Sequence, residues 1–211
     1  MLIGSLDIYE KNNKYYIDNK NQNDIFFMLI ESFQLNENIE LYEKNEYEFS
    51  TIFSLSSLKD YLYHNSFNNI TTDNLLRSLY QQLDFFRERN YSISFMDVSD
   101  IMVINNDKFF FCNSDKLIEM KNGKILITEI YDKSNIFLPP EFITNNTIPF
   151  SIDYSSFYYS LGIIVLYCLQ QKNKKIYSFE EILDYYKEYN FYFTISQCLN
   201  INPSKRKFII F

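Results

Sequence analysis

Glycine is scarce in this chain, which has 211 residues but only three glycines, Gly4, Gly123 and Gly162. A glycine-rich phosphate-binding loop needs several glycines within a few residues, because its backbone must approach the phosphate oxygens closely. The wide spacing of the three glycines excludes a loop of this kind. Any nucleotide phosphate would have to be held in another way.

Cysteine and histidine are also rare, with three cysteines and one histidine. Cys112, Cys168 and Cys198 are widely spaced and form no Cys-x-x-Cys pair, so neither a zinc site nor a disulfide framework is indicated. We expect three buried thiols in a reducing compartment. The single histidine, His64, lies at a predicted helix end, where we expect a polar cap or a surface role.

Positive charge is in deficit, with 20 Lys and Arg against 27 Asp and Glu and a formal net charge of −7. Nucleic-acid surfaces and polybasic membrane anchors both need clustered Lys and Arg, so neither partner is expected. The most apolar stretch, 154–169, is shorter than the ~20 residues that span a bilayer. The N-terminus lacks a signal-peptide layout, and we therefore expect a soluble cytoplasmic protein.

The chain does have a large apolar and aromatic content. Apolar residues make up 46% of the sequence, which is enough for the core of one domain or of a small two-lobed one. The aromatic residues are 19 Tyr and 21 Phe, with no Trp. Heavy use of Asn, Lys, Ile, Tyr and Phe is typical of an AT-rich genome, such as that of a parasite, a slime mould, a low-GC bacterium or a large DNA virus. For a viral protein, the expected location is the host cytoplasm.

The first 54 residues are predicted to be mainly strands. Residues 6–18 form two alternating runs around a Lys-Asn-Asn turn, as in a hairpin. Residues 23–34 fit a short helix with Asn23 as its N-cap. Residues 38–53 alternate in the manner of two further strands.

The remaining residues, 55–211, are predicted to be mainly helical. The expected elements are helices over 54–64, 72–86, 154–169, 178–189 and 193–199, a hairpin over 101–112 and a strand over 124–131. Thr72 or Asp73 is expected to cap the second helix, and the third is apolar almost all round, so it should be buried centrally. This order predicts an α+β fold of two lobes, a reduced strand-rich lobe over 1–54 and a mainly helical lobe over 55–211.

The order of motifs in the second lobe resembles the C-terminal lobe of the eukaryotic-type protein kinases. The run PPE, 139–141, stands where that family has Ala-Pro-Glu. The run FYYSLG, 157–162, resembles the family's Asp-x-Trp-Ser-x-Gly helix, with Gly162 matching. The run NPSKR resembles its Asp-Pro-x-x-Arg motif, so the resemblance implies that Arg206 and Glu141 form a buried, bidentate ion pair.

The catalytic motifs of that family are replaced in this sequence. The run DIMVI resembles the Asn-Ile-Leu-Val of the family's catalytic loop, so Asp100 matches the metal-binding Asn. Five residues earlier, Phe95 stands at the position of the catalytic Asp. Thirteen residues after Asp100, Asn113 stands at the position of the Asp in Asp-Phe-Gly.

The N-terminal register follows from residues 36–44, NENIELYEK, which resemble the family's His-Pro-Asn-Ile-x-x-Leu-Tyr. This register makes 23–34 the family's αC helix and places Asp18 at the position of the conserved Lys. The position of the αC glutamate falls near Phe27, with Glu31 close by.

Phosphoryl transfer needs cations that neutralise phosphate charge and a carboxylate that orients the attacking hydroxyl. Asp18 would supply an anion where a cation is needed, and Phe95 cannot accept a proton. The resemblance therefore implies a catalytically inactive kinase-like protein, a pseudokinase, that binds a protein partner as a regulatory scaffold. It implies no cofactor.

Asp97 and Asp100 leave other interpretations open. With a loop two residues shorter, Asp97 becomes the catalytic carboxylate and Asp100 a metal ligand, which describes an unorthodox phosphotransferase that uses ATP and Mg²⁺. Alternatively, both aspartates satisfy backbone donors of their own loop, or hold a stray cation. A third function class is a structural virion or assembly protein on a kinase-like scaffold.

Overall fold

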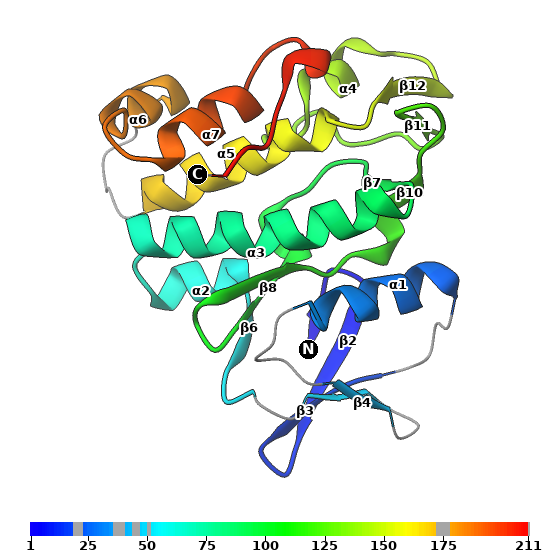
Figure 1. The fold of residues 1–211 in the computed structure, drawn as a ribbon, viewed down its shortest axis with the longest axis vertical. Coiled ribbons are helices and arrows are strands. Elements are labelled where there is room, and N and C mark those ends of the chain that lie inside the picture. Colours follow the sequence, from blue (N-terminus) through cyan, green and yellow to red (C-terminus); the bar gives the residue numbers. More distant parts are fainter. Residues whose placement is uncertain (19–22, 36–40, 44–46, 50–51, 172–177, 211) are drawn as a thin grey trace.

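The computed structural model describes residues 1–18, 23–35, 41–43, 47–49, 52–171 and 178–210. Over this part the protein is a mixture of helices and strands, and the strands form small antiparallel sheets. The N-terminal strands lie at one end of the molecule and the C-terminal helices at the other (Figure 1).

The N-terminal sheet has the strand order β1-β2-β3-β5-β4. Its strands are β1 (Leu2–Ile3), β2 (Leu6–Lys11), β3 (Lys14–Ile17), β4 (Leu41–Glu43) and β5 (Tyr47–Phe49). Asn12 and Asn13, with φ of 54° and 58°, form the two-residue turn between β2 and β3, so the predicted hairpin is confirmed. Of the strands predicted over 38–53, β4 and β5 are present, while 38–40, 44–46 and 50–51 lie outside the described residues.

Helix α1 (Asp24–Phe33) begins at its predicted N-cap. The Asn23 Oδ1 accepts a hydrogen bond from the Phe26 backbone N at 2.7 Å, which satisfies one of the free donors of the first turn. At the other end of the helix, Phe33 packs against Phe49 of β5 with ring centroids 6.4 Å apart. The predicted helix is therefore confirmed, and aromatic contacts fix it to the sheet.

The second sheet has the order β6-β8-β9. Its strands are β6 (Leu55–Ser57), β8 (Ile101–Ile104) and β9 (Lys108–Phe111), and the last two are the predicted hairpin. The prediction of a helix over 54–64 is wrong at its start, because β6 pairs with β8 before α2 (Leu58–His64) begins.

Helix α3 (Asn69–Glu88) starts earlier than predicted, and the cap predicted at Thr72 or Asp73 is wrong. Asn68 is the N-cap, and its Oδ1 accepts a hydrogen bond from the Thr71 backbone N at 3.1 Å. The Thr72 hydroxyl donates to the Asn68 carbonyl oxygen at 2.9 Å, so this side chain bonds back along the helix instead of capping it.

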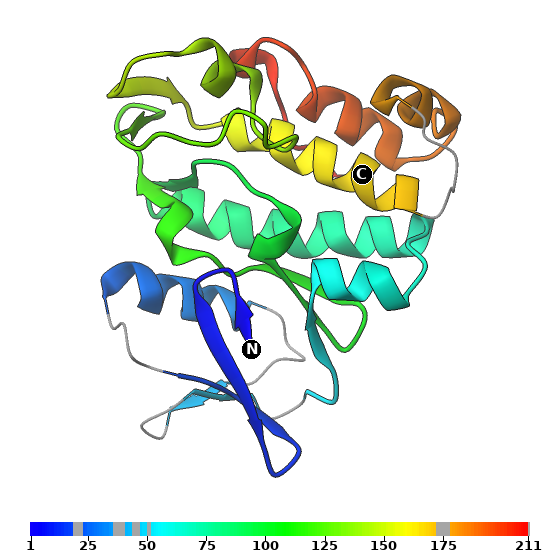
Figure 2. The same ribbon diagram turned by 180° about the vertical axis from the view of Figure 1, so that it is seen from behind.

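The C-terminal helices are α5 (Ser156–Gln171), α6 (Phe179–Tyr185) and α7 (Phe191–Cys198). Helix α5 lies between α3 and α7 in both Figure 1 and Figure 2, and most of its side chains are buried. The central helix predicted from its all-round apolar surface is confirmed. The two helices predicted to follow it are also present, with α6 shorter than predicted and α7 starting earlier.

Strand β11 (Lys124–Ile127) pairs with β12 (Phe150–Asp153) in a sheet of two strands. The strand predicted over 124–131 is wrong beyond Ile127, because the chain leaves the ladder there and Ile130 is exposed. Several short elements were not predicted, since each is too short for a periodic pattern. They include β1, β12, β7 (Tyr91–Ile93), β10 (Leu117–Glu119) and α4 (Pro140–Thr144).

Most buried apolar side chains belong to one cluster that runs from Ile3 to Phe208, so the N-terminal strands and the C-terminal helices share a core. A smaller cluster lies around β11 and β12. Its buried members are Phe95, Ile125, Ile127, Leu138, Phe142 and Ile152. The three cysteines are buried free thiols, as predicted.

Gln82 of α3 ties three elements together inside the core. Its side-chain Nε2 donates to Ser32 Oγ of α1 and to the Phe111 carbonyl oxygen of β9, both at 2.8 Å. Its Oε1 accepts from the Phe111 backbone N at 2.7 Å. The amide is fully buried and its donors and acceptor are all used, as a buried amide requires.

Gly162 of α5 makes room for the segment that follows α7. A Cβ at this position would lie 2.8 Å from Leu199 Cδ2. We expect Gly162→Ala to lower the free energy of unfolding by about 1–3 kcal/mol in urea titrations, because Leu199 or the helix must shift. In a Leu199→Ala background the same substitution should cost less, and an equal cost in both backgrounds would contradict this packing argument.

Candidate functional site

Asp97 and Asp100 hold their own loop together. Asp97 is the N-cap of a single 3₁₀ turn, Val98–Asp100, and its Oδ1 accepts a hydrogen bond from the Ser99 backbone N at 2.8 Å. In return, Asp100 Oδ2 accepts from the Asp97 backbone N at 2.9 Å, which completes a capping box. The two aspartates therefore satisfy backbone donors of the loop, one of the roles that the sequence left open.

A lysine that the sequence analysis missed lies between the two carboxylates. Lys116 Nζ is 2.6 Å from Asp100 Oδ2 and 3.1 Å from Asp97 Oδ2. The same ammonium lies 3.9 Å from the ring centroid of Phe95, in cation–π geometry. Lys116 thus bridges the two carboxylates with its single positive charge.

The position of Lys116 follows from strand pairing and not from a sequence motif. Strand β10 pairs with β7, with Leu117 opposite Ile93, and the Ser94 backbone N donates to the Lys116 carbonyl oxygen at 2.9 Å. This pairing brings Lys116 beside the loop that follows β7. No local sequence pattern predicts this pairing, because β7 and β10 have only three residues each.

Asp100 is the buried centre of this group of side chains, with 1% of its surface exposed. Its second carboxylate oxygen, Oδ1, accepts a hydrogen bond from Asn113 Nδ2 at 2.6 Å. Its backbone carbonyl oxygen accepts from the Cys112 backbone N at 2.8 Å and from Cys112 Sγ at 3.0 Å. The structure therefore brings together Asp97, Asp100 and Asn113, three of the positions singled out from the sequence.

The two carboxyl groups have opposite pKa shifts. Burial raises the pKa of Asp100 above its usual value; Lys116 opposes this effect, and the charge of Asp97 adds to it. Burial also acts to raise the pKa of Asp97, but the Lys116 charge and the hydrogen bonds from Ser99 outweigh it, so this pKa is lowered. Burial likewise raises the pKa of the Cys112 thiol, which makes it a poor nucleophile.

The turn between β1 and β2 covers this group. The Gly4 backbone N donates to the Ser99 carbonyl oxygen at 3.0 Å, and the Ser5 backbone N donates to the Cys112 carbonyl oxygen at 3.1 Å. Gly4 has a φ of 58°, and a Cβ at this position would lie 2.5 Å from the Cys112 carbonyl oxygen, so only glycine fits. Ser5 Oγ also accepts from the Ser114 backbone N at 2.7 Å.

Phe95 lies on the other side of Lys116, in the smaller apolar cluster. Its ring packs edge-on against Tyr131 and Phe142, with centroids 4.9 and 6.1 Å away, and 5% of the residue is exposed. This side chain is therefore a core residue that also contacts the ammonium of Lys116.

The N-terminal candidates lie elsewhere. Asp18 follows β3, and its backbone N donates to the Asp7 carbonyl oxygen at 2.9 Å. Phe27 is partly exposed, and Glu31 lies 3.9 Å from Arg89 at the surface. Part of the run that set this register, 36–40, lies outside the described residues.

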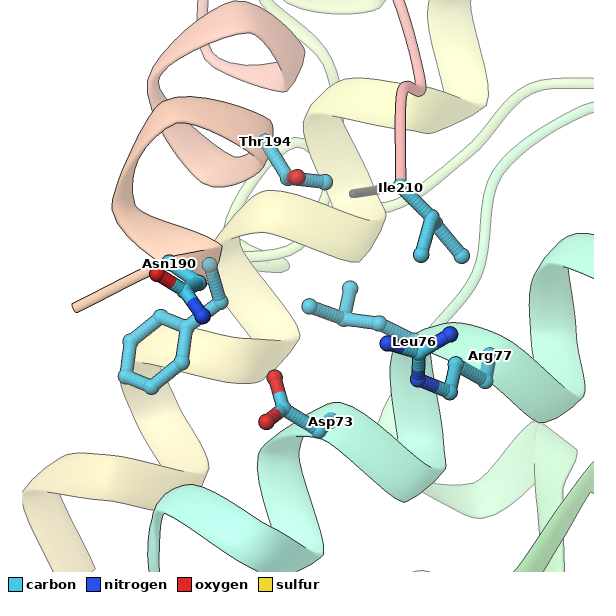
Figure 3. A pocket seen from close by; sticks show the side chains of 7 residues that line it. Asp73, Leu76, Arg77, Asn190, Thr194 and Ile210 are labelled. Carbon is cyan, nitrogen blue, oxygen red and sulfur yellow. The ribbon is translucent and has the colours of Figure 1, made fainter.

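Two of the pockets in the described part of the chain have walls that do not include Asp97, Asp100 or Lys116. The one in Figure 3 is lined by Asp73, Leu76, Arg77, Asn190, Phe191, Thr194 and Ile210. Its volume of about 20 Å³ gives room for a single water molecule. A more open pocket of about 270 Å³ adjoins the smaller apolar cluster, with Tyr131 and Phe142 in its wall.

Glu141 and Arg206 form a bidentate ion pair. Arg206 Nη1 and Nη2 lie 2.6 and 2.9 Å from the two carboxylate oxygens of Glu141, and the Arg206 side chain is fully buried. Its Nε donates to the Asn200 carbonyl oxygen at 2.7 Å. The pair therefore ties the first turn of α4 to the segment after α7, in the arrangement that the motif resemblance implied.

Neither the models of known protein families nor the curated protein sequences gave a match to this chain. Within the described part of the chain, no three His, Cys, Asp or Glu side chains are grouped so that they could hold a metal ion. The helices described here include none with the length and apolar character needed to cross a membrane.

Removal of the Lys116 charge tests its role as the compensating cation. We expect Lys116→Met to lower the free energy of unfolding by about 3–5 kcal/mol at neutral pH, because the buried Asp100 carboxylate loses its partner. Urea unfolding measures this loss. Lys121→Met is the matched control, because that side chain is 81% exposed, and its effect should stay below about 0.5 kcal/mol.

The loss in Lys116→Met should also depend on pH. Without the lysine, the folded-state pKa of Asp100 rises further above its unfolded value of about 3.9. A carboxyl group with a raised folded-state pKa costs stability in full above that pKa; the cost shrinks as the pH falls below it and is gone below the unfolded-state pKa. The variant should therefore approach the wild type in acid, and a loss that is constant with pH would contradict this account.

The Glu141–Arg206 pair makes a separate prediction. Glu141→Gln should destabilise the fold by about 3–5 kcal/mol in urea titrations, because it leaves the buried Arg206 guanidinium without an anion. In an Arg206→Met background, the same change should cost far less. Glu129→Gln, at an exposed position, is the control, and an equal loss in this control would argue against the pair.

Proposed function

We propose that this chain is a catalytically inactive, protein-kinase-like protein that binds a protein partner and does not transfer phosphate. The proposal rests on one observation. The ammonium of Lys116 lies between Asp97 and Asp100, and the backbone of Gly4 and Ser5 covers the loops around them. The two carboxylates share this one cation, and each also accepts hydrogen bonds from other donors.

Phosphoryl transfer places demands that this arrangement does not meet. A Mg²⁺ ion at the two aspartates would have to displace Lys116, which is held at 2.6 Å from Asp100. A general base should be a ready proton acceptor, but the pKa of Asp97 is lowered by Lys116 and Ser99 in excess of the effect of burial. These contacts argue against the alternative in which Asp97 and Asp100 serve an unorthodox phosphotransferase.

The kinase-like part of the proposal is supported by the contacts that hold the chain together. Glu141 and Arg206 make the bidentate pair that the resemblance implied. Gly162 lies on the central helix where close packing against Leu199 requires it. The motif residues with a structural role thus make the contacts that the resemblance implies. At the positions where the family has carboxylates, Phe95 and Asn113 have side chains that cannot take part in phosphoryl transfer.

Nucleotide binding tests the proposal directly. A ligand at 100 times its Kd stabilises the native state by about 2.7 kcal/mol, which would raise the melting temperature of a chain of this size by roughly 5–10 °C. We expect no rise with millimolar ATP and either MgCl₂ or MnCl₂. Radiolabelled phosphate from ATP should likewise not be incorporated into the chain or into a general acceptor protein.

The Asp97→Asn variant is the control for this experiment. It should behave as the wild type in both assays. A metal-dependent rise in melting temperature, or label transfer that Asp97→Asn abolishes, would overturn the proposal in favour of the phosphotransferase.

A further inference from the structure

The open pocket of about 270 Å³ is formed by two segments of the chain. One segment follows β11 and supplies wall residues between 129 and 133, and the other runs from Phe142 in α4 to Phe150 in β12. These elements lie at the end of the molecule away from the N-terminal sheet (Figure 1). An engineered apolar cavity of about 150 Å³ holds benzene, so the volume of this pocket is enough for a larger ring system.

Lys133 joins the two segments. Its Nζ donates to the carbonyl oxygens of Ile143 and Asn145 at 2.9 and 3.1 Å, and to Asn146 Oδ1 at 2.7 Å. An ammonium has three protons, so all the donors of this side chain are used. The two walls are therefore connected before any ligand binds, which lowers the cost of ordering them on binding.

Aromatic rings form part of the wall. Phe142 is 3% exposed, and its ring centroid lies 5.3 Å from that of Tyr131 and 5.7 Å from that of Phe150, both edge-to-face. Tyr131 also packs edge-on against the buried Phe95, at 4.9 Å. The rings are thus fixed in position, and aromatic rings fixed in this way favour contact with a further flat aromatic ring.

Two polar groups of the wall have no partner. The described residues provide no hydrogen bond or ion pair to the Glu129 carboxylate or to the Tyr131 hydroxyl. A carboxylate only accepts hydrogen bonds, so a ligand that satisfies Glu129 needs a donor group. The charges of Glu129 and Lys133 cancel, so the wall is neutral overall and favours neither a cationic nor an anionic ligand.

We propose that this pocket binds the indole ring of a tryptophan in a partner protein. An indole is a flat, neutral, bicyclic ring, and its one N–H group is a donor that matches the free acceptors of the wall. Tryptophan is also among the residues that contribute most to binding at the centres of protein interfaces. The inference names the chemistry of the partner in the proposed function and rests on its protein-binding half.

Two observations favour a tryptophan of another protein over other occupants. The chain itself contains no Trp, so neither its own segments nor a second copy can supply an indole. Ile130 and Ile148 of the wall are 82% and 44% exposed, so apolar surface continues out of the pocket, where residues beside the tryptophan can cover it. A free indole compound would leave most of this surface in water.

The test uses the full chain and the peptide acetyl-Gly-Ser-Leu-Trp-Leu-Ser-Gly-amide. Because the chain has no Trp, selective excitation of indole reports on the peptide alone. We expect saturable binding, with a rise in indole anisotropy and a blue shift of its emission as the ring leaves water. Binding should change little between low and moderate salt, because the wall is neutral overall.

Competing ligands test the choice of ring and of its source. Peptides with Phe or Leu in place of Trp should compete about tenfold more weakly, since they lack the N–H group and part of the ring area. Free indole should also bind about tenfold more weakly than the Trp peptide, because it does not cover the exposed isoleucines.

Variants of the wall locate the site. Glu129→Gln keeps the size of the side chain but replaces the charged acceptor, and should weaken peptide binding about threefold. Tyr131→Leu removes one ring and should weaken it about fivefold. Ile130→Ser should weaken it several-fold, whereas Ile70→Ser, at a position on α3 outside the pocket wall that is 74% exposed, is the matched control and should bind as the wild type does.

Thermal unfolding of each variant checks that it is folded. The inference fails if the Trp peptide does not bind at millimolar concentration, if the Phe peptide binds equally well, or if Glu129→Gln and Ile130→Ser leave binding unchanged. Free indole that binds as tightly as the peptide would overturn the choice of a protein partner. None of these results concerns phosphotransfer, which is tested by the nucleotide-dependent rise in melting temperature, so the two failures can be told apart.

Discussion

The centre of this protein is arranged around the buried carboxylate of Asp100, which needs a cation and hydrogen-bond donors close to it. Asp100 accepts hydrogen bonds from Asn113, from the backbone of Asp97 and from Lys116. In a largely apolar surrounding, an ionised group is tolerated only with such partners. Each partner comes from a different point of the chain, so the charge of one side chain fixes the relative positions of several segments.

The turn between β1 and β2 also helps to fix the central loops in place. Gly4 and Ser5 reach the central loops through backbone hydrogen bonds, so the first sheet is tied to the second by groups that do not depend on side-chain identity. Side chains matter at two points: position 4 requires glycine because the Cys112 carbonyl oxygen approaches closely, and the Ser5 hydroxyl accepts from the Ser114 backbone N. The centre is therefore filled by groups of the protein itself, with Lys116 between the two carboxylates and the turn of Gly4 and Ser5 bonded to the loops around them.

Much of the fold could be predicted from the sequence because periodicity and turn residues are local signals. The apolar run of α5 and the Asn-rich hairpin turns were sufficient to place a buried helix and two hairpins. The short strands β7 and β10 gave no such signal, and with them the sequence analysis lost Lys116, whose position depends on their pairing. The start of α3 shows the same limit, since Asn68, Thr72 and Asp73 are all suitable cap residues and the sequence does not say which of them caps the helix.

The candidate site was predictable only in part. Motif spacing singled out four residues that form two bonded pairs in the structure, Asp100 with Asn113 and Glu141 with Arg206. What the spacing could not supply was the charge balance, because the compensating cation is distant in sequence from the two aspartates and belongs to no motif. Similarly, no pattern in residues 1–5 indicates that their turn would lie over the central loops.

The buried side-chain amide of Gln82 restricts movement between the elements that it joins. It bonds at once to α1, which packs on the N-terminal sheet, and to β9, which belongs to the second sheet. If α1 moved relative to β9, the Gln82 amide would lose hydrogen bonds and its polar atoms would stay unpaired in an apolar interior. The described parts of the first sheet, α1 and the second sheet should accordingly move together as one rigid unit.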